Sequence, residues 1–139
     1  MNGIVYAREQ DLPVADYAEV IAHSTLTRPI RDPERMATLL AGSNLIVTAR
    51  LDGRCVGLAR CLSDGAWVAY CADLAVDDRY QGRGIGKGLL KKVKEIIGDG
   101  VGLALLSVPD AIPFYEKMGP VMGFERNTDA FWLPRTRGA

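Results

Sequence analysis

A short apolar strand, a glycine-rich bend and the start of a helix follow one another in residues 74–88. Glycine lets backbone amides approach a ligand closely because it carries no Cβ atom. The first turn of the helix that follows leaves its N–H groups without partners, and the helix dipole makes that end positive. We therefore expect an anion such as a pyrophosphate to bind at this bend.

Spacing separates three phosphate-binding motifs at the bend. If Gly86 is the glycine before a P-loop lysine, the first glycine of that motif falls on Gln81 and its hydroxyl residue on Gly88, so the motif fails twice. The dinucleotide motif G-x-G-x-x-G also fails, because neither Gly82 nor Gly84 starts a run with glycine at the last position. The pattern that remains is Gln81-x-x-Gly84-x-Gly86.

Residues 85–97 predict a helix directly after the bend. Their apolar members recur with helical spacing and form one stripe, and Gly98 is expected to end the helix. Lys87 lies in the first turn, where a positive charge opposes the helix dipole unless an anion is bound. Arg83 and Lys87 are therefore candidate phosphate contacts.

The composition is typical of one globular domain, expected over residues 1–139, because 48% of the residues are apolar. The formal net charge is zero, which argues against a general nucleic-acid binder. No apolar run approaches the roughly 18 residues of a membrane span, and the first residues lack the charged and apolar regions of a signal peptide. We expect a cytoplasmic protein without a nucleic-acid or membrane partner.

Cysteine and histidine offer little for metal or nucleophilic chemistry. Cys55, Cys61 and Cys71 lie in apolar segments without a C-x-x-C pair, so we expect buried thiols without an activating partner. A zinc site or a Ser-His-Asp triad would depend on His23, the only histidine, which we expect on a helix surface or at a helix cap. The sequence predicts no metal site.

Turn signals and hydrophobic periodicity divide the chain into strands and helices. The Asp52-Gly53 pair predicts a tight hairpin, and Pro33 after Asp32 predicts a helix start. The expected strands are residues 4–7, 45–51, 54–62, 66–76 and 102–108, with a terminal pair at 124–126 and 130–133. The expected helices are residues 13–23, 34–41, 85–97 and 111–118. This order predicts an α/β fold whose mixed sheet is flanked by helices.

The pattern Gln81-x-x-Gly84-x-Gly86 resembles the acetyl-coenzyme A signature, Gln/Arg-x-x-Gly-x-Gly/Ala, of the GNAT superfamily of N-acetyltransferases. The expected order of elements is similar to that of the GNAT fold from end to end. A second segment, residues 111–119, is similar to the family's Phe-Tyr-Glu-Lys-x-Gly-Phe motif. The chain departs from this motif at residues 120–122, which separate the usual Gly-Phe pair and leave the turn into the last hairpin open.

The resemblance implies a mostly antiparallel sheet in which a splayed pair of strands, residues 66–76 and 102–108, holds acyl-CoA. Backbone groups of Leu74 and Val76 would pair with the pantetheine arm as an added strand does, and an N–H would stabilise the oxyanion. The bend would hold the pyrophosphate. The cofactor-binding residues implied are Leu74, Ala75, Val76, Gln81, Gly82, Arg83, Gly84, Ile85, Gly86, Lys87 and Phe114.

The resemblance also implies how protons move. Tyr115 matches the family's general acid, whose phenol would protonate the departing thiolate. Asp73 is the best-placed carboxylate to accept the amine proton, because burial in an apolar run would raise its pKa. Two alternatives stay open: Asp73 pairs with an arginine or caps a backbone group, or a chain of water molecules is the base.

We expect direct transfer of the acetyl group from acetyl-CoA to a small primary amine in a ternary complex, without an acyl-enzyme. Arg28 and Arg31 would favour an anionic acceptor, although solvation explains these arginines as well. The alternatives are a peptide or protein N-terminus, a lysine side chain, or a non-catalytic module that binds acyl-CoA and regulates a partner. A homodimer is expected, because acceptor pockets in this architecture often include a neighbouring subunit.

Overall fold

The computed structural model describes residues 3–136. The chain divides into two compact units, residues 1–106 and residues 107–139. The first unit holds the sheet and three helices, and the second holds one helix and the C-terminal segment. The expectation of one domain over residues 1–139 stays a prediction.

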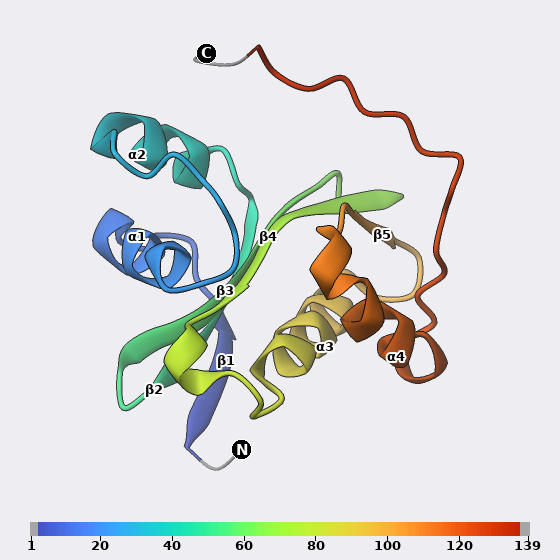
Figure 1. The fold of residues 1–139 in the computed structure, drawn as a ribbon, viewed down its shortest axis with the longest axis horizontal. Coiled ribbons are helices and arrows are strands. Elements are labelled where there is room, and N and C mark those ends of the chain that lie inside the picture. Colours follow the sequence, from blue (N-terminus) through green and yellow to red (C-terminus); the bar gives the residue numbers. More distant parts are fainter. Residues whose placement is uncertain (1–2, 137–139) are drawn as a thin grey trace. The chain divides into compact units, whose positions relative to one another are not determined.

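The first unit is a five-stranded sheet with helices on both faces (Figure 1). The sheet order is β1-β2-β3-β4-β5, with antiparallel pairing from β1 to β4 and parallel pairing of β4 with β5. The strands are β1 (Ile4–Arg8), β2 (Leu45–Leu51), β3 (Arg54–Ser63), β4 (Val68–Val76) and β5 (Gly102–Leu105). The helices are α1 (Val14–Ala22), α2 (Pro33–Ala41) and α3 (Ile85–Ile97). This arrangement confirms the predicted mixed, mostly antiparallel α/β fold.

Two apolar clusters, one on each face of the sheet, form the core of the first unit. Helices α1 and α2 pack on one face, where Tyr17 and Leu40 contribute to a cluster with Leu58 of β3. Helix α3 packs on the other face, where Leu89 joins Val47 of β2. Strands β2 and β3 are buried on both faces, which explains their nearly continuous apolar sequences. All three cysteines are buried free thiols, as predicted.

Local sequence signals set the element ends as expected. The Asp32 side chain accepts hydrogen bonds from the N–H groups of Glu34 and Arg35, so it caps α2, and a proline takes the first helical position. The Asp52-Gly53 turn joins β2 to β3. Helix α3 ends at Ile97 and its C-cap is Gly98.

A β-bulge interrupts β4 near the end of its pairing with β5. Arg60 pairs with Asp73 and Cys61 pairs with Cys71, so Ala72 is an extra residue in the ladder between β3 and β4. Side chains alternate between the two faces along a strand, and the extra residue shifts this alternation. Cys71 therefore lies in the cluster beneath α3, whereas Asp73 contacts α1 on the opposite face.

The second unit contains a 3₁₀ turn (Pro109–Ala111) followed by α4 (Ile112–Met122). The predicted helix at 111–118 is therefore too short at its C-terminal end, because the helix continues through Pro120. Gly123, whose φ is +81°, is the C-cap. Residues 120–122 thus extend a helix and do not form a turn.

The predicted terminal strands at 124–126 and 130–133 are wrong, because residues 124–136 contain no strand in the described part of the chain. The Asn127 side chain accepts a hydrogen bond from the N–H of Asp129, and such a turn competes with strand pairing. Strands β4 and β5 are also shorter than the predicted 66–76 and 102–108. At the start of β4, the Asp64 side chain accepts hydrogen bonds from the N–H groups of residues 66–68, which holds this stretch as a turn.

Candidate functional site

The free edge of β4 is the main feature of the candidate site. Strand β4 pairs with β5 from Val68 to Cys71, and within residues 3–136 no strand pairs with this edge beyond Cys71. Pairing stops one residue before the bulge at Ala72, and a bulge bends and twists its strand. Within residues 72–76, the backbone N–H and C=O groups that point away from β3 therefore have no strand partner among the described residues. Strand β5 ends at Leu105, where its pairing with β4 also ends, and the splay of the two strands expected from the sequence stays a prediction.

Leu74 and Val76 direct their backbone groups toward this free edge. The N–H of Asp77 donates to the carbonyl of Val56, and residues of an antiparallel pair alternate between bonding to the partner and facing away from it. Every second residue of β4, counted back from Asp77, therefore bonds to β3. The residues between them direct their backbone groups away from β3. Leu74 and Val76 are in the second group, and their side chains pack in the cluster beneath α3.

The glycine-rich bend follows β4 through a 3₁₀ turn (Asp78–Tyr80). The Gln81 side chain donates a hydrogen bond to the carbonyl of Val76 at 3.3 Å, which ties the bend to the end of β4. Gly82 and Gly84 both have a φ of +78°, and an added Cβ atom at either position would meet no atom within 4 Å. The bend therefore combines a backbone conformation that favours glycine with open space in front of it.

Helix α3 begins directly after the bend. Gly84 is its N-cap, no side chain of the described residues caps it, and its first turn contains no acidic residue. Its first N–H groups therefore point at the bend as donors for an anion. Lys87 lies in this first turn, and the Arg83 guanidinium lies 5.4 Å from the centre of the Tyr80 ring. Both predicted phosphate contacts thus lie beside the N-terminus of α3.

Asp73 occupies the other face of β4 and is fully buried, with 0% of its side chain exposed. Its carboxylate accepts hydrogen bonds from the Tyr17 hydroxyl at 2.7 Å, from Arg28 Nε at 2.9 Å and from Arg60 Nε at 2.6 Å. These donors come from α1, from the loop between α1 and α2, and from β3. Arg60 also donates to the Ser43 hydroxyl at 3.0 Å. Asp73 and four side chains around it are named the Asp73 cluster below: Tyr17, Arg28, Arg60 and Ser43.

The Asp73 cluster fixes the charge state of its members. Burial raises the pKa of Asp73, but the charges and hydrogen bonds of Arg60, Tyr17 and Arg28 lower it, and its pKa is below the ordinary value. Burial and the nearby Asp73 charge raise the pKa of Tyr17. At neutral pH Asp73 is therefore an anion and Tyr17 is neutral.

The predicted rise in the pKa of Asp73 is wrong. The alternative that the sequence left open, an aspartate paired with arginine, describes the structure: Arg28 and Arg60 both form ion pairs with it. The physical reason is the bulge at Ala72, which turns Asp73 away from the apolar cluster beneath α3 and toward these two arginines.

Sequence reasoning did not single out Tyr17 or Arg60 as members of the site. Tyr17 belongs to the apolar stripe of α1, so its pattern indicates only core packing. Arg60 interrupts an otherwise apolar stretch of β3, and a charged residue inside a buried strand is rarely left unpaired. That interruption was the available signal for a buried ion pair.

In the second unit, Phe114 and Tyr115 lie near the start of α4. Their rings are 5.0 Å apart at an interplanar angle of 84°, and the ring of Tyr115 lies 6.1 Å from that of Phe124 at 69°. These edge-to-face contacts orient Tyr115 within its own unit. The roles of Tyr115 as general acid and of Phe114 as a cofactor contact stay predictions.

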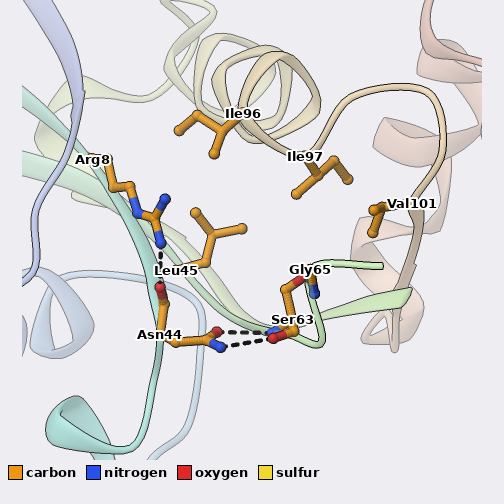
Figure 2. A pocket seen from close by; sticks show the side chains of 8 residues that line it. All are labelled: Arg8, Asn44, Leu45, Ser63, Gly65, Ile96, Ile97 and Val101. Atoms are coloured by element: carbon orange, nitrogen blue, oxygen red, sulfur yellow. Dashed lines mark hydrogen bonds between the residues drawn. The ribbon is translucent and has the colours of Figure 1, made fainter. Parts of the chain in front are cut away.

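A small pocket lies elsewhere in the first unit (Figure 2). Ile96 and Ile97 from the end of α3 line it, and the Asn44 amide bonds to the backbone carbonyl and N–H of Ser63 at its rim. Helix α3 has 13 residues, so the pocket lies about 18 Å from the glycine-rich bend. It is therefore not part of the candidate site.

Residues 3–136 show features of neither a membrane span nor a metal site. None of the helices in this range combines the length and the apolar character that crossing a membrane requires. The same residues contain no group of three or more His, Cys, Asp or Glu side chains placed to hold a metal ion. The expectation that no metal is needed stays a prediction.

The sequence is similar to known acetyltransferases. Residues 10–119 match the model of the Acetyltransferase (GNAT) family. Two curated relatives are histone acetyltransferase TAP1 from Glycine max, 34% identical over 83 residues, and serotonin N-acetyltransferase 2 from Oryza sativa subsp. japonica, 31% identical over 108 residues. The matches cover 58% and 73% of this chain but 36% and 52% of the relatives. The chain thus spans between a third and about half of their length.

A solved structure shows the same fold. The GNAT-family acetyltransferase of Streptococcus pneumoniae TIGR4 superposes with a TM-score of 0.70 and 26% identity, over 96% of this chain and 99% of that chain. The family model covers most of the sequence, and the sheet, the bend and the helix after it have the arrangement described above. The chain therefore belongs to the Acetyltransferase (GNAT) family.

Proposed function

We propose that this chain transfers the acetyl group of acetyl-CoA to the primary amine of a small molecule. The observation that carries the proposal is the free edge of β4, which leads directly into the glycine-rich bend and the N-terminus of α3 within one unit. A free strand edge pairs with an extended chain of amides, and a helix N-terminus binds phosphate. The two ends of one segment thus match the pantetheine arm and the pyrophosphate of coenzyme A.

The residues present fit this cosubstrate. Leu74 and Val76 offer backbone groups at the free edge, and the space in front of Gly82 and Gly84 is open for phosphate oxygens. Hydrogen bonds to charged groups contribute about 1.5–3 kcal/mol each. Three or four of them supply much of the roughly 8 kcal/mol that micromolar binding requires. Backbone donors alone therefore give useful affinity.

The proposed reaction moves one acetyl group and two protons. The amine nitrogen attacks the thioester carbon with its lone pair, so that a C–N bond forms and the C–S bond breaks. The sulfur leaves with the bonding electrons and takes one proton, while the amine gives one proton to a base. A backbone N–H at the free edge, which we assign to Leu74, would stabilise the negative charge that develops on the carbonyl oxygen.

Tyr115 is the proposed source of the proton for the sulfur, because a phenol is a competent acid for a thiolate at hydrogen-bond distance. For the amine proton we propose water and not Asp73. The Asp73 carboxylate is buried, already accepts three hydrogen bonds and has a lowered pKa, which makes it a weak base. An amine with a pKa near 10 is neutral in only about one molecule in a thousand at pH 7, so turnover should rise with pH.

The names of the relatives include acceptors as different as a histone and serotonin, so they do not fix the size of the acceptor. A peptide N-terminus or a lysine side chain is the enzymatic alternative, and a non-catalytic module that binds acyl-CoA is the other. The decisive assay incubates the protein with acetyl-CoA and a panel of amines, amino acids and peptides, and measures free thiol. Release with small amines supports the proposal. Release only with peptides, or tight cofactor binding without release, contradicts it.

Replacing Gly84 with valine tests the phosphate site. We expect Gly84→Val to abolish binding of coenzyme A, because a branched side chain would fill the open space and disfavour the positive φ. Gly65→Val is a matched control, since Gly65 also has a positive φ and open space but lies in the turn between β3 and β4. Unchanged affinity in Gly84→Val, measured by calorimetry, would overturn the assignment.

Replacing Tyr115 with phenylalanine tests the proposed acid. We expect Tyr115→Phe to lower kcat much more than it weakens the binding of acetyl-CoA, because only the proton donor is removed. Equal losses of turnover and affinity would remove the acid role from Tyr115. The expected homodimer and cytoplasmic location stay predictions, and light scattering of the purified chain tests the first.

A further inference from the structure

The Asp73 cluster has a net charge of +1, because it contains two arginines and one carboxylate. The single carboxylate of Asp73 forms ion pairs with both Arg28 and Arg60, and Tyr17 is neutral. Arg60 has 15% of its side chain exposed and bonds to the carboxylate at 2.6 Å, so this pair alone balances the charge of Asp73. Arg28 is the more exposed partner, at 36%. Its charge is therefore in excess and reaches solvent.

Arg28 is held firmly although it is partly exposed. Its Nε donates to Asp73, one terminal nitrogen donates to the Ala72 carbonyl at 3.1 Å and the other to the Thr27 carbonyl at 3.1 Å. Leu26 packs against the apolar cluster beneath α1 and α2, as does Ile30, so the loop on both sides of Arg28 is anchored. A guanidinium has five N–H groups, and these bonds use three of them. Among residues 3–136 no acceptor bonds to the other two N–H groups, which are held in a preorganised position.

The bond to Ala72 places this charge beside the free edge of β4. Ala72 is the bulge residue at which pairing with β5 has ended, and Leu74 offers its backbone at the edge two residues later. Two residues of a strand span about 7 Å. The guanidinium of Arg28 is 3.1 Å from the Ala72 carbonyl and therefore lies within about 10 Å of the backbone at which the proposed function positions the acetyl group.

We infer that the acceptor carries a carboxylate close to its amine, and that Arg28 binds this carboxylate while Asp73 and Ala72 hold Arg28 in position. This inference rests on the proposed acetyl transfer and names its substrate class. Guanidinium groups recognise carboxylates through paired N–H groups, and an amino acid separates its carboxylate from its amine by one carbon. Such an acceptor would neutralise the excess charge and present its amine along the free edge.

Arg31 lies three positions further along the same loop and is exposed, and within residues 3–136 it forms no ion pair with an acidic side chain. It therefore lacks the fixed geometry of Arg28. The sequence offered Arg28 and Arg31 equally as partners for an anionic acceptor, and the structure distinguishes them. Arg31→Gln is accordingly the matched control for Arg28→Gln, because each variant removes one positive charge from this loop.

The test compares amino acids with the amines that remain when their carboxylate is removed. Alanine is paired with ethylamine, phenylalanine with phenethylamine, and a peptide amide that starts with aspartate with one that starts with alanine. We measure kcat/KM by thiol release for the wild type and for Arg28→Gln, Arg28→Lys and Arg31→Gln. The peptide pair shows whether the carboxylate comes from a small molecule or from an acidic N-terminus. Circular dichroism confirms that each variant is folded.

We expect the wild type to prefer the carboxylated member of a pair by about 10- to 100-fold, the range of a hydrogen-bonded charge pair. Arg28→Gln should bring this ratio close to one and leave acetyl-CoA binding unchanged, Arg28→Lys should retain part of it, and Arg31→Gln should retain all of it. Equal rates for both members in the wild type, or equal losses for both in Arg28→Gln, would overturn the inference and leave the proposed function intact.

A binding measurement separates this inference from the failure of the proposed function. If no acceptor releases thiol, acetyl transfer is overturned, and calorimetric titration of the amino acids still tests recognition. Binding of the carboxylated members to the wild type and not to Arg28→Gln would support a carboxylate site at Arg28. Binding that both proteins share, or no binding to either, would overturn it.

Discussion

Replacing Asp73 with asparagine should destabilise the fold far more than it alters the chemistry. The asparagine keeps the shape of the side chain but removes the charge that Arg60 and Arg28 require, and it turns an N–H₂ group toward at least one of its donors. Removing one partner of a buried ion pair costs about 3–5 kcal/mol, because the remaining charge stays buried. Most of this cost belongs to Arg60, the more buried partner at 15% exposure.

Arg28 adds less to this figure, because 36% of its side chain is exposed and solvent screens its pair to about 1 kcal/mol or below. We therefore expect a loss of about 3–5 kcal/mol in the free energy of unfolding, which lowers Tm by roughly 10–20 °C for a chain of this length. Urea unfolding followed by circular dichroism measures the change. Asp78→Asn is the control, because Asp78 is an exposed aspartate five positions away.

The pH dependence gives an independent check with a definite sign. The pKa of Asp73 is lowered in the folded protein from the usual value of 3.8, so its contribution to stability is fully present above that value. The contribution is lost as the pH falls from 3.8 through the lower folded pKa. The stability difference between the wild type and Asp73→Asn should therefore be constant near neutral pH and shrink below pH 3.8.

A different outcome would refute the assignment of Asp73 to structure. If the free energy of unfolding of Asp73→Asn is within about 1 kcal/mol of the wild-type value, the carboxylate does not hold the two arginines as described. If it also loses the acidic limb of its pH–rate profile, Asp73 is the base and the proposed water path is wrong.

Two further predictions test packing and the absence of an acyl-enzyme. Gly88→Ala should cost about 1–3 kcal/mol of stability despite the better helix propensity of alanine, because the new Cβ would clash with the ring of Tyr6. The cost should fall in a Tyr6→Leu background, and equal costs in both backgrounds would exclude this contact. Cys71→Ala should keep its turnover in the thiol assay, because a hydrogen bond with the Cys61 thiol and burial raise the pKa of the Cys71 thiol and leave it protonated. Complete loss of turnover in a folded variant would point to a cysteine nucleophile.

The bend and the start of α3 could be predicted because their determinants are local, and phosphate binding there stays a prediction. The spacing of Gln81, Gly84 and Gly86, the apolar stripe that follows and the missing acidic residue in the first turn all lie within one short segment. Helix start and turn signals elsewhere were reliable for the same reason, as at Asp32 and the Asp52-Gly53 hairpin.

The surroundings of Asp73 could not be predicted, because they depend on residues far away in the sequence. Its partners lie 56, 45 and 13 positions away, and nothing local to the 66–76 segment names them. The bulge that directs Asp73 toward them occurs at Ala72, a residue that gives no signal of a bulge. The terminal hairpin failed for a related reason, since strand formation depends on a partner edge that local propensity does not supply.

The bulge at Ala72 links the two halves of the proposed site, and deleting that residue tests this link. Without Ala72, Cys71 and Asp73 become neighbours that still face opposite sides of the sheet, and both keep their partners Cys61 and Arg60 in β3. The deletion therefore removes the bend in β4 but preserves the core beneath α3 and the ion pairs of Asp73.

We expect the variant lacking Ala72 to fold with a Tm near that of the wild type and to bind coenzyme A at least about tenfold more weakly, because we attribute the end of the pairing between β4 and β5 to the bulge. Calorimetric titration with coenzyme A and thermal unfolding measure the two effects. Ala72→Gly is the control, since it keeps the extra residue and should keep the affinity. If the deletion variant folds and binds coenzyme A as tightly as the wild type, the bulge does not create the free edge, and the proposed link between the bulge and cofactor binding must be abandoned.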